Sequence, residues 1–402
     1  MTVTLGYRSL LALPGPRRLA LGAIPADLAD WLDYAAIVAL LVFIWDGGPF
    51  TLALFAVALS LPYVLVGPVL LALFHRMPLR TLLVVSNAGR AATTAALVFA
   101  GDPAIVLAVV FLRSSIDSVF TPARQAAIKA TTPHDLLSPA NGLHQAINQT
   151  SKIAGPALGG LLLGIVAPAV VFALNAGLSL VAAVVMATVA LPHREPEVAT
   201  ETFFRRSLAG LNELRRNRKL RLAVAFIAMA YAAFFLYDAL ISLLAIGFGF
   251  DATAYGLSIA ASGLGGVVGA LVAGRLSGPA PMTVMAAGAG VSGGSTIVVG
   301  AASLADLAVP FWLFFLTMGV MGAATAFILV PYRTIIQSTV AHDRVASVFA
   351  TGEAISVAAM LAAPFIGSTI AVAWGTGAAF IAGGIMLLVL VAWTFAGPAA
   401  RE

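Results

Sequence analysis

The chain is built from long apolar segments separated by short polar connections. Each segment is about 20 residues long, the length that an α-helix needs to cross the hydrocarbon core of a bilayer. Hydrophobic residues make up 61% of the 402 residues and charged residues only 10%, whereas soluble domains carry about 25% charged residues. A chain with so few charged side chains cannot cover a water-facing surface. We therefore predict an integral membrane protein.

Glycine, proline and charged residues divide the apolar segments into twelve predicted spans. The alternation of apolar and polar residues that a membrane β-barrel needs is absent, so the predicted fold class is all-α. The spans lie at roughly 20–44, 51–73, 81–100, 104–121, 141–166, 169–191, 222–246, 254–275, 282–303, 309–331, 348–372 and 377–396.

Lysine and arginine lie on one side of this series of spans. The odd-numbered connections contain Asp46, Asp102, Asp251 and Asp306 but no lysine or arginine. The amino terminus and the even-numbered connections hold the basic residues, among them Arg124. Because basic residues stay on the cytoplasmic side, we predict a multi-pass protein of the cytoplasmic (inner) membrane with both termini in the cytoplasm.

The sixth connection separates two predicted six-helix bundles. It spans 192–221, so the bundles cover 1–191 and 222–402. Its sequence FFRRSLAGLNELRRNRKL places apolar residues at helical spacing among arginines. That pattern fits an amphipathic helix on anionic lipid, and a solvated linker fits it nearly as well.

The two halves share a repeated pattern of prolines. A Pro-x-Arg sequence begins at Pro122 in the first half and at Pro331 in the second. In the first half, Pro156 follows Pro122 by 34 residues. In the second half, Pro364 follows Pro331 by 33 residues. We interpret this as a duplicated six-helix unit, the architecture of secondary transporters whose two bundles rock around a site near the middle of the membrane.

These features together resemble the major facilitator superfamily. Gly155, Pro156, Gly159 and Gly160 in AGPALGG match the antiporter motif of its fifth span, and FTPARQAAIKATTPHDLLSPANGLHQAINQTSKIAGPALGGLL resembles the twelve-span drug:proton antiporters that include macrolide and siderophore exporters. The resemblance implies two pseudo-symmetric six-helix bundles and alternating access. It also implies multidrug-type efflux driven by the proton gradient, with no cofactor, a small-molecule substrate in the lipid bilayer, no nucleic-acid partner and a monomer.

The superfamily motif between the second and third spans is altered here. GPVLLALFHRMPLRTLL keeps Gly67, Arg76 and Arg80, but His75 stands where the family has an aspartate. In the family that aspartate belongs to a charge network that latches the cytoplasmic face. His75 therefore either weakens the latch and makes it sensitive to pH, or is a loop histidine of a degenerate motif.

Three aspartates share one face of the first span. Asp27, Asp30 and Asp33 are spaced by three residues. Asp27 is near enough to the cytoplasmic end to be hydrated, whereas Asp30 and Asp33 lie deeper. Carboxylates that are close together at low dielectric oppose each other's ionisation, so we predict that Asp30 and Asp33 take up and release protons.

The other charged candidates lie in the fourth and fifth spans. Arg113 and Asp117 share a helix face, and Arg113 is placed like the fourth-span arginine that the resemblance implicates in proton coupling. This pair is either a coupling element, which we favour, or a structural pair that neutralises itself. Asn148 and Lys152 belong to a polar stripe of the fifth span, and we predict that Lys152 pairs with an aspartate of the first or fourth span. For Arg90 in the third span we expect a structural bridge.

The second half contains fewer charged candidates. Asp238 lies beyond the middle of the seventh span and Glu353 lies early in the eleventh. Tyr237 precedes Asp238 and is a candidate lid or stacking residue.

The predicted gate is the glycine-proline segment of the fifth span. Gly155 and Gly159 have the small-xxx-small spacing that allows another helix to approach closely. We predict that this segment closes against the other six-helix half. Pro364 and Gly367 predict a similar bend in the second half, without a lysine beside it.

We predict a proton-coupled exporter of small amphipathic or hydrophobic compounds, drug-like or siderophore-like. A carrier of lysophospholipids or other amphiphiles with the same fold is the alternative, and a non-transport membrane protein is less favoured. No enzyme is expected, because the five histidines are scattered and no metal-spaced pair, phosphate-binding loop or nucleophile elbow is present.

Overall fold

A computed structural model describes residues 3–74, 77–191, 212–273, 280–340 and 345–396. Every regular element within these ranges is helical. His75, Arg76 and the first half of the predicted amphipathic segment of the sixth connection lie outside them.

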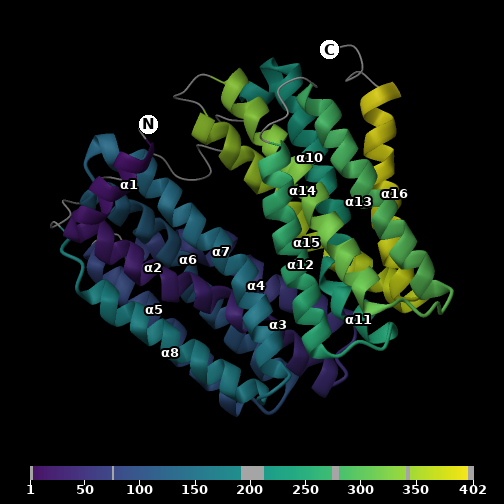
Figure 1. Cartoon of the computed structure of the whole chain (residues 1–402), viewed down its shortest axis with the longest axis horizontal. Helices are drawn as coiled ribbons and strands as arrows, with labels where there is room; N and C mark the ends of the chain where they lie inside the picture. The colour runs from purple at the N-terminus through teal and green to yellow at the C-terminus, as the bar shows by residue number, and fades with distance from the viewer. Residues whose placement is uncertain (1–2, 75–76, 192–211, 274–279, 341–344, 397–402) are drawn as a thin grey trace. The chain divides into compact units, whose positions relative to one another are not determined.

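The first compact unit comprises Met1–Asp46 and Val57–Val198. Its helix α2 packs against α7 and α8, and α5 packs against α6 and α8 (Figure 1). The unit contains α1 (Val3–Ala12), α2 (Pro14–Leu32), α3 (Tyr34–Val38), the π-helix η1 (Ala39–Ile44), most of α4 (Pro49–Leu73), α5 (Leu79–Ala96), the 3₁₀ turn η2 (Leu97–Phe99), α6 (Pro103–Thr131), η3 (His134–Leu136), α7 (Leu137–Leu163) and α8 (Pro168–Ala187).

The second compact unit comprises Gly47–Ala56 and Ala199–Glu402, and therefore includes the start of α4. Its helices pack in the pairs α12–α14, α13–α16 and α10–α15. The unit contains α10 (Arg218–Tyr237), the 3₁₀ turn η4 (Asp238–Leu240), α11 (Ile241–Gly247), α12 (Ala252–Ala273), α13 (Pro281–Leu304), α14 (Phe311–Thr339), α15 (Val345–Trp374) and α16 (Thr376–Ala396).

The helices begin where local sequence favours a start. Proline is the first residue of α2, α4, α6, α8 and α13, a position where its missing N–H costs no hydrogen bond. Asp102 caps α6 by accepting a hydrogen bond of 3.0 Å from the backbone N–H of Ile105. Asn217 caps α10 in the same way, accepting from Leu220 N–H at 3.2 Å.

Helices occupy all twelve predicted ranges, but they do not all qualify as spans by length and composition. Within the described residues, nine helices are long and apolar enough to cross a bilayer, and Leu361–Trp374 forms a shorter apolar helix. The predicted first and fifth spans are outside this set. The first is broken and rich in charge, and the fifth carries the polar stripe. The count of twelve stays a prediction.

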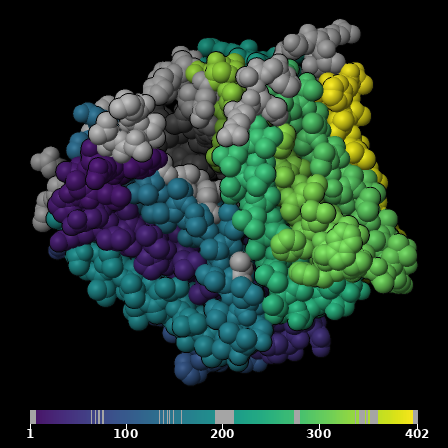
Figure 2. All heavy atoms as spheres, viewed as in Figure 1, coloured from purple at the N-terminus to yellow at the C-terminus, as the bar shows by residue number. Residues whose placement is uncertain are grey.

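The outward faces of both units are apolar. Exposed side chains include Val184 at 67% of its free surface in the first unit and Val298 at 68% in the second. Within the second unit, the green helices pack directly against one another in the space-filling view (Figure 2). Helices that are apolar on both their buried and exposed sides are typical of a protein surrounded by lipid.

Both units contain a break in their first long helix, and an aspartate lies at each break. In the first unit α2 ends at Leu32, and α3 begins only after Asp33. In the second unit α10 ends at Tyr237, and the next three residues, from Asp238, form a 3₁₀ turn. A broken helix at membrane depth exposes backbone polar groups, and it is tolerated where protein or a polar cavity surrounds it.

Candidate functional site

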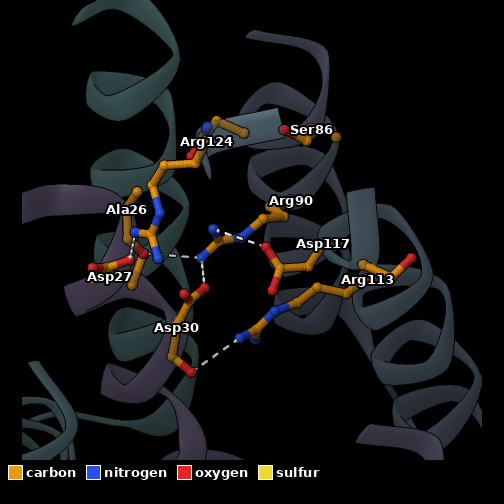
Figure 3. Close-up of polar contacts among 12 residues, drawn as sticks. Ala26, Asp27, Asp30, Ser86, Arg90, Arg113, Asp117 and Arg124 are labelled. Atoms are coloured by element: carbon orange, nitrogen blue, oxygen red, sulfur yellow. Dashed lines mark hydrogen bonds and ion pairs between the residues drawn. The ribbon is translucent and has the colours of Figure 1, made fainter. Parts of the chain in front are cut away.

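The three aspartates of the first span are each bonded to an arginine from another helix. Asp27 bonds to Arg124 with a distance of 2.5 Å between Oδ1 and Nη1. Asp30 bonds to Arg90 of α5. Asp33, in the helix break, bonds to Arg113 of α6. Figure 3 shows the side chains of Asp27, Asp30 and the three arginines converging from α2, α5 and α6.

Arg90 is the centre of this charge network. Its side chain is only 1% exposed and it bonds to two carboxylates, Asp30 and Asp117, the latter with a distance of 3.1 Å. It also donates a hydrogen bond of 3.0 Å to the backbone carbonyl of Ala26 (Figure 3). Asp117 accepts a further hydrogen bond from the hydroxyl of Tyr63 on α4. Arg90, on α5, therefore connects that helix to α2 and α6. This agrees with the expected structural bridge. The sequence did not indicate that Arg90 would be the centre of the network.

Asp27 and Arg124 are buried, contrary to the expectation that Asp27 is hydrated and that Arg124 lies in a connection. Asp27 is 0% exposed and Arg124 is 7% exposed. The reason is that α6 continues to Thr131 through Pro122. A proline inside a helix removes one hydrogen bond and need not end a membrane helix. The predicted end of the fourth span at residue 121 was therefore ten residues too early.

A phenylalanine contacts two arginines of this region. The guanidinium carbon of Arg90 is 5.8 Å from the centre of the Phe120 ring, and that of Arg124 is 5.2 Å from it. These distances allow a cation–π interaction with each arginine. Phe120 is itself 1% exposed, so it meets both guanidiniums in the interior of the unit.

Arg113 and Asp117 bond to other helices. Arg113 bonds to Asp33 of the break, and Asp117 bonds to Arg90 and Tyr63. Arg113 and Asp117 therefore do not form the self-neutralising structural pair that was the alternative.

Lys152 lies over the face of Trp31, with 5.5 Å between Nζ and the centre of the ring. Trp31 directly follows Asp30, so Lys152 is beside the charge network. The aspartates predicted as its partners are bonded to arginines. Asn148, one helical turn before Lys152, is half-buried.

The glycines of the fifth span pack against α2 of their own unit, a contact that the sequence did not indicate. Their predicted closure against the other half stays a prediction. A Cβ added to Gly155 would be 2.5 Å from Cβ of Trp31. A Cβ added to Gly159 would overlap the carbonyl oxygen of Leu32, the last residue of α2. Pro156 and Gly160 are buried beside them. The small residues therefore bring α7 against the break in the first span.

The second unit repeats this contact. A Cβ added to Gly367, three residues after Pro364, would overlap the carbonyl oxygen of Leu236. Leu236 immediately precedes the last residue of α10. In each half, a glycine three residues after a helix proline thus contacts the carbonyl of a leucine next to the break.

The remaining candidates of the second half differ in exposure. Asp238 has an exposed side chain. Tyr237 is 1% exposed and its ring centre is 4.9 Å from that of Phe380, so it belongs to the core and cannot act as a lid. The side chain of Glu353 lies outside the described residues.

Two members of the altered motif are described. Gly67 is buried, and a Cβ added to it would be 3.1 Å from Cβ of Ser118 on α6. Arg80 is exposed near the start of α5. Within the described ranges, no group of three or more histidines and carboxylates has an arrangement that could hold a metal ion.

A model of the family described as Major Facilitator Superfamily matches residues 19–304. The chain belongs to the major facilitator superfamily. It is therefore a multi-pass membrane transporter with the all-helical fold of that superfamily.

Two similar relatives are known by sequence. The uncharacterized MFS-type transporter YfiS of Bacillus subtilis is 25% identical over 385 residues, covering 94% of this chain and 91% of the relative. Macrolide efflux protein A of Streptococcus pyogenes is 26% identical over 167 residues, covering 40% of this chain and 41% of the relative.

Solved structures of other transporters share the fold. The nucleoside transporter NupG superposes with a TM-score of 0.69 at 15% identity, over 96% of this chain and 99% of that one. A bacterial homologue of the human lysosomal transporter Spinster gives a TM-score of 0.74 at 11% identity, over 96% of this chain and 97% of that one.

Proposed function

We propose that this superfamily member is a proton-coupled exporter of small amphipathic or hydrophobic compounds. The observation that supports this most is the charge balance around Arg90. The network contains the four carboxylates Asp27, Asp30, Asp33 and Asp117 but three guanidiniums, because Asp30 and Asp117 share Arg90. Counted over these seven side chains, without Lys152 beside them, the cluster has one excess negative charge. One added cation stabilises it, and a proton on a carboxylate is the smallest such cation.

The proton goes to the pair that shares Arg90. The side chain of Asp30 is 22% exposed and that of Asp117 is 11%, whereas those of Asp27 and Asp33 are at most 1%. Asp30 is thus the carboxylate that water reaches most easily. Protonation of Asp30 weakens its bond to Arg90, so that Arg90 then forms an ion pair with Asp117 only.

This exchange acts next to the break in the first span. Asp30 is three residues before Asp33 in the helix break, where Arg113 holds the chain from α6. A change in the bond between Asp30 and Arg90 therefore acts on α2 where the α2–α3 helix is discontinuous. We propose that the break lets α2 tilt as the protein alternates between its two open states.

Export and the substrate class rest on similarity. The antiporter motif at Gly155–Gly160 and the relative named macrolide efflux protein A both favour efflux of a small molecule. We further propose the cytoplasmic (inner) membrane as the location, both termini in the cytoplasm, and a monomer as the working unit.

Transport assays in proteoliposomes whose membrane contains the purified chain test the coupling between protons and substrate. With a pH gradient as the only driving force, we expect the parent protein to move radiolabelled erythromycin, a macrolide, against its gradient. Asp30→Asn and Lys152→Ala are expected to lose at least about tenfold of this accumulation while the melting temperature of each variant shows that it folds. Asp102→Asn, which keeps the helix cap in the same half, is the matched control and is expected to transport like the parent.

Accumulation at the parental level in both variants would show that the charge network does not couple transport to protons. Transport of a fluorescent lysophospholipid in place of the macrolide would identify the chain as a carrier of amphiphilic lipids.

A further inference from the structure

One described carboxylate of the second half, that of Asp238, differs in its surroundings from the aspartates of the charge network in the first half. Asp238 lies at the break after α10 and its side chain is exposed. No hydrogen bond or ion pair connects it to another described residue, whereas each aspartate of the charge network bonds to an arginine. A carboxylate at membrane depth is costly when it has no counter-charge.

We propose that Asp238 and the aromatic face of α10 form a binding site for a lipophilic organic cation. This inference rests on the proposed function in that it names the charge of the exported compound. The site is different from the proton site at Asp30, which lies in the other half.

The repeat explains why no arginine among the described residues of the second half pairs with Asp238. When Pro331 is aligned with Pro122, Gly322 takes the place of Arg113 and Ala326 takes the place of Asp117. Gly322 packs against the backbone of Ser262 on α12 so closely that a Cβ there would overlap its carbonyl oxygen. The fourth helix of the second half therefore has no side chain where the first half has the arginine that holds Asp33.

Other cations are also absent near this point of the sequence. Between residues 222 and 331 the only basic residue is Arg275, in the connection between α12 and α13. The second half therefore has an aspartate at the helix break, but it has no arginine at the repeat position whose side chain neutralises the aspartate in the first half.

The face of α10 that carries Asp238 is aromatic. Tyr231, Phe234 and Phe235 precede Asp238 by seven, four and three residues, so they share its side of the helix. All three are partly exposed, and Tyr231 and Phe234 also pack against the buried core of the second unit, whereas Ala233 and Leu236 are buried. The rings of Tyr231 and Phe235 are stacked with 5.9 Å between their centres.

This arrangement suits a particular kind of ligand. The carboxylate attracts a positive charge, and the faces of aromatic rings attract both a cation and an apolar body. A compound with one delocalised or quaternary positive charge inside an apolar shell satisfies both. An anion of the same size and shape is repelled by Asp238.

The test uses two ions that differ in the sign of their charge but have nearly the same size and shape. The purified full chain in lipid nanodiscs is dialysed at equilibrium against radiolabelled tetraphenylphosphonium or tetraphenylborate, with empty nanodiscs as background. We expect the parent protein to bind the cation and not the anion. Asp238→Asn is expected to weaken binding of the cation by at least about tenfold, and Asp238→Glu by no more than about threefold.

Asp251→Asn is the matched control, because it removes a carboxylate from an exposed loop of the same half and keeps the cap on Ala254. It is expected to bind the cation like the parent. Equal binding of both ions by the parent, or unchanged binding of the cation by Asp238→Asn, would overturn the proposal. If Asp238→Asn does not fold, the preference of the parent for the cation and the behaviour of Asp238→Glu decide the question.

Binding in nanodiscs needs no pH gradient, so this result is independent of proton coupling. A chain that binds the cation through Asp238 but shows no transport driven by protons would contradict the proposed function and support the site.

Discussion

Replacement of Arg90 by methionine is expected to destabilise the chain by about 3–5 kcal/mol and to abolish transport. Arg90 is almost fully buried and is the counter-charge for both Asp30 and Asp117. Its removal leaves Asp30 and Asp117 at membrane depth without the guanidinium that neutralises them, and the apolar volume of methionine does not compensate for their burial. Unfolding of the purified variant with sodium dodecyl sulfate, followed by tryptophan fluorescence, measures the loss.

Arg80→Met is the matched control, because Arg80 is on the same helix but exposed near its start. It is expected to change stability by less than about 0.5 kcal/mol. Arg90→Met combined with Asp30→Asn is expected to recover part of the lost stability, since one of the two uncompensated charges is then gone. Equal stability of Arg90→Met and the parent would mean that the network is not held together by Arg90.

Alanine at Gly159 or at Gly367 is expected to destabilise the chain by about 1–3 kcal/mol and to stop transport. A Cβ at either position overlaps a backbone carbonyl oxygen, of Leu32 in the first half and of Leu236 in the second. A backbone atom cannot turn away as a flexible side chain can, so α7 or α15 has to move off the helix break. The melting temperature and the transport rate of each variant measure the effect.

Gly177→Ala and Gly294→Ala are the matched controls, one in each half. Both glycines are inside helices, and no atom lies within 4 Å of a Cβ added there. Because alanine favours a helix over glycine by about 1 kcal/mol, these variants are expected to be as stable as the parent or more so. The close contacts at the breaks would be refuted if Gly159→Ala and Gly367→Ala behaved like the two controls.

The charged residues of the network were recognisable in the sequence, but their partners were not. Asp30, Asp33, Arg113 and Asp117 stand out because charges inside a membrane span are rare. Their bonds join residues that are 27 to 83 positions apart in the chain, and no local pattern carries that information. Arg90 stands out in the sequence for the same reason, yet its central role depends on which face of α5 turns toward α2.

For the repeated prolines, too, the sequence indicated the residues but not their contacts. The spacing of the prolines predicted a bend in both halves, and both prolines lie inside helices, Pro156 in α7 and Pro364 in α15. The sequence did not indicate that the glycines beside them contact the helix breaks of their own halves, because small residues specify only that something comes close and not which helix it is.

By itself the sequence determined that the chain lives in a bilayer as a bundle of helices, because the length and composition of its segments leave no other way to satisfy the backbone. It also indicated that Asp30, Asp33, Arg90, Arg113 and Asp117 carry charge into that bilayer, whereas it placed Asp27 near the cytoplasmic end and Arg124 in a connection. Only the tertiary structure decided that Arg90 serves two carboxylates, that Gly159 and Gly367 contact the breaks of their own halves, and that Asp238 pairs with no arginine among the described residues. These outcomes depend on how helices rotate and pack, and packing is set by many contacts between residues far apart in the chain.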